Sequence, residues 1–217
     1  MKNVLFIALF GCLLLGRAQA EELPLAIPRD VGLSAEKLAR VTTLVQGAVD
    51  KNQTAGVVVL IARHGKVPYL ETFGKLNAST GEPMPLDAIF RIHSMSKPIT
   101  TAAALLLYEE GRFKLDEPVS KYLPEFKGLR VSAGKNDETV GAKREMTIRD
   151  LMRHTSGLTY GMPNGTGVDK MYIAKGIDGP ELSLAEMVAA LGELPLQDQP
   201  GTRFNYSIST DVLIVLR

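Results

Sequence analysis

The sequence predicts an α/β protein of the α+β type, in which an antiparallel hairpin flanked by helices precedes a mostly helical region. An amphipathic pattern over residues 34–51 is followed by two β-branched runs, 55–63 and 66–74, which a His-Gly pair separates. A third, strongly apolar run over residues 94–110 has the period of a helix. The chain has 217 residues, of which 45% are hydrophobic and 23% charged, as in an ordinary globular protein.

The first predicted helix spans residues 34–51. Ser34 directly precedes the apolar periodicity, and its hydroxyl suits the N-cap, where a side-chain oxygen accepts a hydrogen bond from a free backbone N–H group. Leu33 and Leu38 are spaced as a hydrophobic staple across that cap. Four apolar residues fall on one face of the helix: Leu38, Val41, Val45 and Ala48. Such a one-sided pattern predicts a half-exposed helix.

A second helix is predicted from Ser94, or just after it, to Glu110. Its residues are apolar nearly all round, which is typical of a helix inside a protein. Pro98 lacks a backbone N–H group and is tolerated only in the first turn, which fixes where the helix begins. Gly111 is expected to end the helix, because glycine readily adopts the left-handed conformation found at that position.

Shorter elements are predicted in the second half of the chain. Thr147 is placed to open a short helix that stops before Gly157, and Ser183 and Glu186 form a capping box for a helix that reaches Leu191. The polar stretch before Thr147 and the glycine-rich stretch after Gly157 are expected to be loops. No repeat or linker divides the chain, so no second complete domain is expected.

The N-terminus has the features of a secretory signal peptide over residues 1–20. Lys2 precedes a short apolar run, and the Ala-Gln-Ala sequence that follows suits cleavage after Ala20. The run is shorter than the roughly 20 residues of a membrane-spanning helix. Lipoprotein modification at Cys12 is the less favoured alternative, because the apolar run continues past the cysteine. We therefore expect a secreted or periplasmic protein whose domain covers residues 21–217.

Charge and histidine spacing exclude several partners. The formal net charge is +1, and no basic stripe is interleaved with aromatic residues, which argues against nucleic acid. Cleavage would remove Cys12, the one cysteine, so no disulfide or thiolate ligand would remain. The three histidines are far apart in the sequence and do not form a metal-binding pattern. We expect no cofactor, no metal and no stable membrane insertion of the mature protein.

A serine precedes a lysine by three residues at three places, in the pairs Ser34–Lys37, Ser94–Lys97 and Ser132–Lys135. A lysine can activate a serine as a base only when it is neutral, which requires a site poor in water that lowers its pKa. Lys37 lies in a half-exposed helix and Lys135 in a polar loop, whereas Lys97 lies in the apolar helix, on the same face as Ser94. Free N–H groups at the helix start also suit an oxyanion hole. The catalytic interpretation is therefore favoured over Ser94 as a plain N-cap with Lys97 on the surface.

Other catalytic signatures are not found in the sequence. No Gly-x-Ser-x-Gly motif occurs, which argues against an α/β-hydrolase with a Ser-His-Asp triad. His154, in the tetrapeptide HTSG, is better explained as a hydrogen-bonded structural histidine. Residues 128–136 resemble a phosphate loop but have the wrong spacing, with Asn136 where Ser or Thr is needed.

Four blocks resemble, in the same order, the serine β-lactamase and penicillin-binding superfamily. More narrowly, they are similar to class C β-lactamases and family VIII carboxylesterases. The blocks are FRIHSMSKPIT, GRFKLDEPVSKYLPEF, MTIRDLMRHTSGLTYG and PGTRFNYSISTDVL. The resemblance implies a β-lactamase-like fold, with an antiparallel sheet flanked by helices and an all-helical region. It also implies that Ser94 is the nucleophile, and that Lys97 and Tyr206, in FNYSI, move protons as an acyl-enzyme forms and is hydrolysed. The substrate would be a small ester or β-lactam.

The sequence departs from this family in two ways. Ile208 stands where the Tyr-x-Asn motif of β-lactamases carries an amide that binds the substrate, which favours a carboxylesterase. The family also continues with C-terminal strands after the helix at residues 211–217, so an incomplete domain, unstable or inactive by itself, is expected. The alternatives are a class C-type β-lactamase or D-Ala-D-Ala peptidase, and a non-catalytic member that binds peptides or cell-wall fragments.

Overall fold

The computed structural model describes residues 22–134 and 138–216. The predicted signal peptide, with its cleavage site at Ala20 and the lipidation alternative at Cys12, lies outside these residues, as does Lys135. The chain divides after Phe90 into two compact units. Among the described residues, no helix combines the length and the apolar character needed to cross a membrane.

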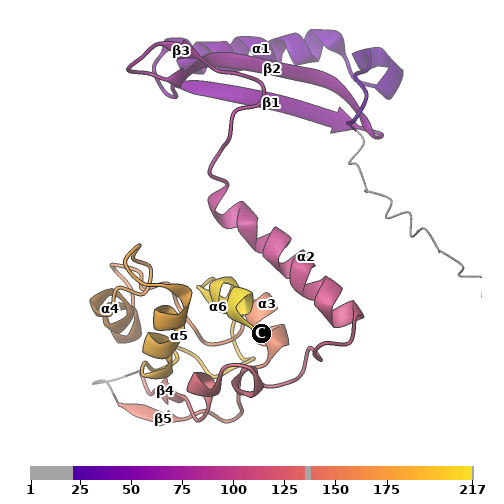
Figure 1. Ribbon diagram of the computed structural model, residues 1–217. Helices are drawn as coiled ribbons and strands as arrows, with labels where there is room; N and C mark the ends of the chain where they lie inside the picture. The colour runs from indigo at the N-terminus through magenta and orange to yellow at the C-terminus, as the bar shows by residue number, and fades with distance from the viewer. Residues whose placement is uncertain (1–21, 135–137, 217) are drawn as a thin grey trace, which may run out of the picture. The chain divides into compact units, whose positions relative to one another are not determined.

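The first unit is a small antiparallel sheet with one long helix along it (Figure 1). Its elements are the 3₁₀ helix η1 (Pro28–Val31), the helix α1 (Ala35–Asp50) and the strands β1 (Gly56–Arg63), β2 (Lys66–Asn77) and β3 (Glu82–Pro83). The strand order is β1-β2-β3, and α1 packs against β2. The short strand β3 was not among the elements predicted from the sequence.

The predicted hairpin and helix cap of this unit are confirmed. His64 and Gly65 have φ angles of 52° and 69°, so both residues of the two-residue turn are left-handed, as a type I′ hairpin turn requires. The hydroxyl of Ser34 accepts a hydrogen bond of 3.3 Å from the N–H group of Lys37. This first Ser–Lys pair therefore caps a helix.

The second unit begins at Arg91 and is mostly helical. Its α-helices are α2 (Ser96–Glu109), α3 (Ile148–Met152), α4 (Gly167–Ala174), α5 (Leu184–Gly192) and α6 (Ser209–Val215). Its 3₁₀ helices and strands are η2 (His93–Met95), η3 (Val119–Lys121), η4 (Pro124–Phe126), β4 (Arg130–Ser132) and β5 (Thr139–Gly141). The short β4–β5 sheet lies where a loop was predicted, α4 begins at the end of the predicted glycine-rich loop, and α3 and α5 are confirmed.

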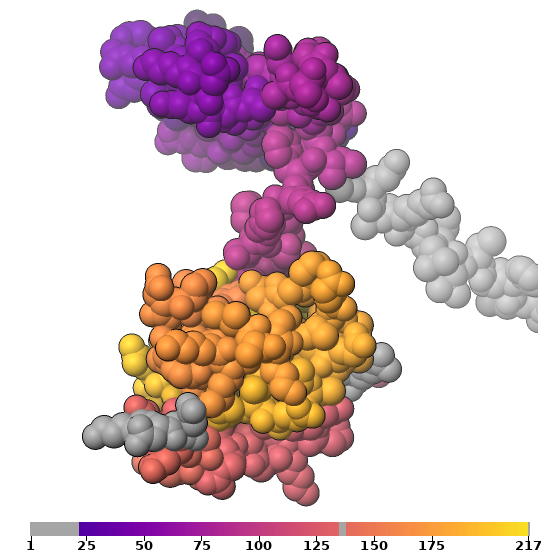
Figure 2. Space-filling model, turned by 90° about the vertical axis from the view of Figure 1, so that its left-hand side faces the viewer, coloured from indigo at the N-terminus to yellow at the C-terminus, as the bar shows by residue number. Residues whose placement is uncertain are grey.

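The core of the second unit lies where α3, α5 and α6 pack together. Leu151 of α3 and Leu191 of α5 are fully buried, as is Val212 of α6. In the space-filling view, the orange and yellow segments lie against one another, with the coral segments below them (Figure 2). The mixed helical and antiparallel architecture confirms the predicted α+β fold class.

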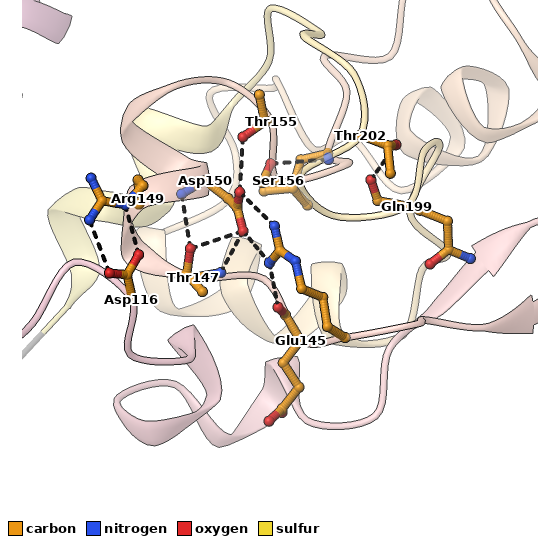
Figure 3. A network of polar contacts seen from close by, with 11 residues as sticks. Asp116, Glu145, Thr147, Arg149, Asp150, Thr155, Ser156, Gln199 and Thr202 are labelled. Carbon is orange, nitrogen blue, oxygen red and sulfur yellow. Dashed lines mark hydrogen bonds and ion pairs between the residues drawn. The ribbon is translucent and has the colours of Figure 1, made fainter.

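A buried carboxylate ties α3 to the segments beside it (Figure 3). Asp150 accepts hydrogen bonds of 2.6 and 3.0 Å from the guanidinium of Arg144, one of 2.9 Å from the N–H of Thr147, and one of 2.9 Å from the hydroxyl of Thr155. Burial raises the pKa of Asp150, but the guanidinium and the other donors outweigh it and leave the pKa below its usual value. The turn that follows α3 is thereby fixed.

Helix α2 differs from the prediction in its burial. Gly111 ends the helix as expected, with φ of 73°, and hydrogen bonds from Gly111 and Arg112 to Tyr108 and Leu107 complete a Schellman motif. However, every residue of α2 is at least partly exposed, and Leu106 is 62% exposed. Within the second unit α2 packs chiefly on one side, against α6, so this unit by itself does not bury the helix as expected.

Candidate active site

An open pocket of about 430 Å³ lies in the second unit. Its walls come from η2, the first turns of α2, α6 and the loop after α3, and include Ser94, Lys97, Thr100, Tyr160, Thr210 and Asp211. The volume falls in the range of small-molecule sites, about 300–1,000 Å³.

Ser94 lies in η2, directly before α2, and is exposed at the pocket. The N-cap of α2 is Met95, so the alternative in which Ser94 is the cap is wrong. His93, immediately before it, has a φ angle of 44°. A left-handed non-glycine residue costs conformational energy and is common at functional sites. The exposure of Ser94 leaves its hydroxyl accessible, and the left-handed residue before it is a second sign of a functional site.

Lys97 lies in the first turn of α2, with Pro98 after it as predicted, and is half-buried. Its Nζ lies 5.2 Å from the ring centroid of Tyr160 and 5.3 Å from that of Tyr206. The two ring centroids are 5.6 Å apart, and both distances from the ammonium are within cation–π range. The structure thus brings Lys97 and Tyr206 together, beside the pocket that Ser94 lines.

The charge of Lys97 differs from the prediction. Burial lowers its pKa, but the interaction with Tyr160, the charge of Asp211 and the proximity of Tyr206 outweigh burial, and its pKa is raised. Within this unit the expectation of a neutral lysine in a dry site is wrong, because Tyr160, Asp211 and Tyr206 together outweigh the burial of the amine and raise its pKa. Lys97 is an ammonium group at neutral pH.

Tyr206 is held through its neighbours in the chain. The backbone N–H of Asn205 donates to the carbonyl of His154 at 2.8 Å, and the Asn205 amide donates to the carbonyl of Leu158 at 2.9 Å. The ring of Tyr206 is 4.8 Å from that of His154, at an angle of 40°. His154 is hydrogen-bonded, as the sequence predicted, and packs directly on the predicted proton-transfer residue.

Two pocket residues were missed in the sequence analysis. Burial raises the pKa of Tyr160, with Asp211 acting in the same direction and Lys97 in the opposite one. One carboxylate oxygen of Asp211 is buried and has no hydrogen-bond partner among the described residues. Tyr160 shares a block with HTSG, but only the pairing of residues 154–158 with residues 205–209 places it at the site.

Ile208 does not line the pocket. Its side chain is 2% exposed and belongs to the core, and it precedes α6 as the N-cap residue. The expectation that it occupies a substrate-facing position is therefore wrong in this structure.

The other features of the site bear on metals and on the remaining serine–lysine pair. Within residues 22–134 and 138–216, no three His, Cys, Asp or Glu side chains lie close enough to hold a metal ion. Ser132 lies in β4, where its hydroxyl accepts a hydrogen bond of 3.1 Å from the N–H of Gly134. Ser94 and Lys97 line one pocket together, whereas Lys135 of the third pair lies outside the described residues.

Comparison with known proteins gives several matches of similar extent. Over 189 residues the chain is 35% identical to Esterase EstB of Burkholderia gladioli, which covers 86% of this chain and 46% of the relative. The structure matches EstCE1, described as a hydrolase with promiscuous acyltransferase activity, with a TM-score of 0.69 and 33% identity, over 82% of this chain and 45% of that one. A class C beta lactamase shares the fold, with a TM-score of 0.61 and 24% identity, over 83% of this chain and 43% of that one.

The chain spans about half the length of the relatives it matches. Residues 41–215, which include parts of both units and every pocket residue, match the Beta-lactamase family. The order of the four sequence blocks, the fold and this match agree, and the chain belongs to the Beta-lactamase family.

Proposed function

We propose that this chain carries the reacting residues of a serine hydrolase that cleaves carboxylic esters through an acyl-enzyme. The observation that carries the proposal is the ammonium group of Lys97, which lies beside the ring of Tyr206 at a pocket with an exposed serine. Two relatives, Esterase EstB and the hydrolase EstCE1, are named for this kind of reaction.

The proposed reaction begins with attack of the Ser94 Oγ on the ester carbonyl carbon, while its proton moves to Tyr206. Electrons of the C=O bond move to the carbonyl oxygen, where the backbone N–H of Ser94 is suited to donate. Collapse of this intermediate breaks the bond to the alcohol, which leaves with the proton from Tyr206. Water then attacks the acyl-enzyme, gives a proton to Tyr206, and Ser94 recovers its proton as the acid leaves.

The ammonium group of Lys97 supports this reaction by its charge. An adjacent cation stabilises the phenolate form of Tyr206, which is the form that can take the proton of Ser94. The raised pKa of Lys97 is consistent with a lysine that stays protonated and assigns proton transfer chiefly to Tyr206. This division of roles replaces the neutral-lysine base of the sequence prediction.

Short-chain esters are the proposed substrate class, ahead of β-lactams. The relative with 35% identity is named an esterase, whereas the β-lactamase match at 24% identity supports the fold alone. The test is hydrolysis of p-nitrophenyl butyrate and of nitrocefin by the purified protein. Faster turnover of nitrocefin would reverse the order of the two substrate classes.

Covalent labelling tests the nucleophile directly. A fluorophosphonate probe is expected to label the protein at Ser94, and Ser94→Ala should abolish the labelling. Ser96→Ala is the matched control, because Ser96 lines the same pocket two residues away and should not be needed. Labelling that persists in Ser94→Ala would contradict the assignment, and an unlabelled wild type would favour a non-catalytic binding protein.

We also propose that the protein is exported to the periplasm or medium after cleavage of residues 1–20. Lys2, the apolar run and the Ala-Gln-Ala sequence support this proposal. Sequencing the N-terminus of the exported protein should give Glu21 as the first residue. A retained Met1 or a lipid-modified Cys12 would overturn it.

A further inference from the structure

Three buried serine hydroxyl groups form a row that begins at Ser207, the residue after Tyr206. Ser207 Oγ is 2.7 Å from Ser209 Oγ, which is 2.7 Å from Ser156 Oγ, and all three serines are fully buried. Ser156 Oγ also accepts a hydrogen bond of 3.2 Å from the N–H of Leu158. Unpaired buried hydroxyls are costly, so this row fixes residues 207–209 against the turn at residues 154–158.

His154 occupies the end of this row. Its Nδ1 lies 3.2 Å from the backbone nitrogen of Ser207, whose N–H donates to it, and 3.5 Å from the hydroxyl of Ser207. A nitrogen that accepts this bond has a free lone pair, so the imidazole is neutral and carries its proton on Nε2. The same ring packs on Tyr206 at 4.8 Å. The imidazole of His154 thus contacts the ring of Tyr206 directly and is also bonded to Ser207, the residue that follows Tyr206.

We propose that His154, acting through Ser207, is a positioning residue that holds the ring of Tyr206 beside the ammonium group of Lys97. The inference rests on the proposed function, since Tyr206 must remain near Lys97 to transfer the proton of Ser94. Together with the two bonds from Asn205, the His154–Ser207 bond clamps Tyr206 on both sides along the chain.

Protonation of His154 would release this clamp, because a protonated Nδ1 faces the N–H of Ser207 and has no lone pair to accept it. The charged and titratable groups that face His154 are Lys97 on α2, Asp211 on α6 and Tyr206 on its loop. Burial and the Lys97 charge lower the pKa of His154, and Asp211 opposes them less strongly, so the net shift is downward from 6.5. The clamp is therefore intact at neutral pH and lost as the pH falls through this lowered value.

Two substitutions at one position separate positioning from simple packing. Asn in His154→Asn tolerates the left-handed backbone, where φ is 55°, and offers an amide oxygen to Ser207 but cannot be protonated. His154→Ala removes the acceptor. We expect kcat for p-nitrophenyl butyrate to fall about 10- to 100-fold in His154→Ala with KM nearly unchanged, the size expected for a misplaced reacting group. His154→Asn should keep most of kcat and lose the acidic limb of the wild-type pH profile.

His64→Asn is the matched control, because His64 has a similar φ of 52° but lies in the exposed hairpin turn. Its kcat and pH profile should equal those of the wild type. Equal losses in His154→Asn and His154→Ala, or an unchanged kcat in His154→Ala that folds normally, would overturn the proposal.

A spectroscopic measurement keeps this inference separate from the proposed function. The ¹⁵N chemical shifts of His154 in the wild-type protein should identify Nε2 as protonated and Nδ1 as an acceptor at pH 7. A protonated Nδ1 would overturn the inference even if Ser94 is labelled by the fluorophosphonate. Failure of that labelling with the expected Nδ1 signal would instead overturn the proposed function, and with it the catalytic purpose assigned to the clamp.

Discussion

The side chains of Tyr206 and Lys97 lie close together beside the pocket, but contacts of different kinds hold them in place. Tyr206 lies between residues that hydrogen-bond to the turn at residues 154–158, and the serines behind it are fully buried. Lys97 lies on α2, every residue of which is at least partly exposed. The tyrosine side is thus fixed by polar bonds and a core, whereas the nucleophile side depends on one helix that packs chiefly against α6.

Because of this difference, substitutions on the two sides should affect catalysis and stability to different extents. On the nucleophile side, Ser94 and Lys97 can be changed with little loss of packing, because few of the contacts that stabilise the fold pass through them. On the tyrosine side, the same segments carry the reacting group and part of the core, so many substitutions there alter both properties. Four substitutions, one of them with a matched control, test this contrast.

Lys97→Met should reduce kcat for ester hydrolysis about 10²- to 10⁴-fold, the range for loss of a group that assists proton transfer. The methionine keeps the length of the side chain but removes the charge beside Tyr206. Because Lys97 is only half-buried, the thermal midpoint should stay close to that of the wild type. A large fall in the midpoint would contradict the contrast between the two sides.

Leu151→Ala should lower the free energy of unfolding by about 2–5 kcal/mol, since it leaves a cavity in the core. Leu151 is fully buried on α3, whereas Leu106 on α2 is 62% exposed. The matched change Leu106→Ala should stay within about 0.5 kcal/mol. Denaturant unfolding compares the two, and equal costs would mean that α2 is covered in solution.

Asp150→Asn should destabilise the protein by about 1–3 kcal/mol at pH 7, because it removes the charged acceptor of the bonds from Arg144, Thr147 and Thr155, while the guanidinium left behind is partly solvated. The pKa of Asp150 is lowered in the folded protein, so its stabilising contribution is complete above its ordinary value of 3.8 and is lost as the pH falls through the folded value. The difference between wild type and variant should therefore shrink below about pH 4. A constant difference would contradict the ion-pair explanation.

Arg149→Ala should have the smallest effect. Arg149 pairs with Asp116 at 2.7 and 3.0 Å, next to the Asp150 network, but both side chains are exposed. Exposed pairs add little to stability and are screened by salt. We expect no measurable change in the thermal midpoint at physiological salt, and a change as large as that of Asp150→Asn would contradict the role assigned to burial.

Elements with strong local signals could be predicted from the sequence. The hairpin follows from β-branched runs around a His-Gly turn, and α1, α3 and α5 from caps at Ser34, Thr147 and Ser183. The sheet β4–β5 could not be predicted, because its strands are only three residues long and pair across a polar loop. Helix α4 was hidden by the glycine-rich segment before it, although Thr166 and Asp169 form a capping box.

The candidate site was predictable only in part, for a similar reason. Ser94, Lys97 and Tyr206 were identified in advance, and the structure places Ser94 and Lys97 in one pocket and Tyr206 beside Lys97. Tyr160 and Asp211 were missed because their place depends on tertiary pairing of distant segments. The prediction that Lys97 is neutral was wrong. The apolar composition of α2 indicated burial, but the surroundings of the amine depend on which distant segments pack against the helix.

Each hydroxyl in the row formed by Ser156, Ser209 and Ser207 can donate a hydrogen bond to the next hydroxyl or accept one from it. Rotation of the three hydroxyl hydrogens about their Cβ–Oγ bonds therefore reverses the polarity of this row of hydrogen bonds, while every heavy atom stays in place. When a proton arrives at or leaves Tyr206, the protein interior beside it can respond by reorienting hydrogens alone, much faster than a backbone segment moves.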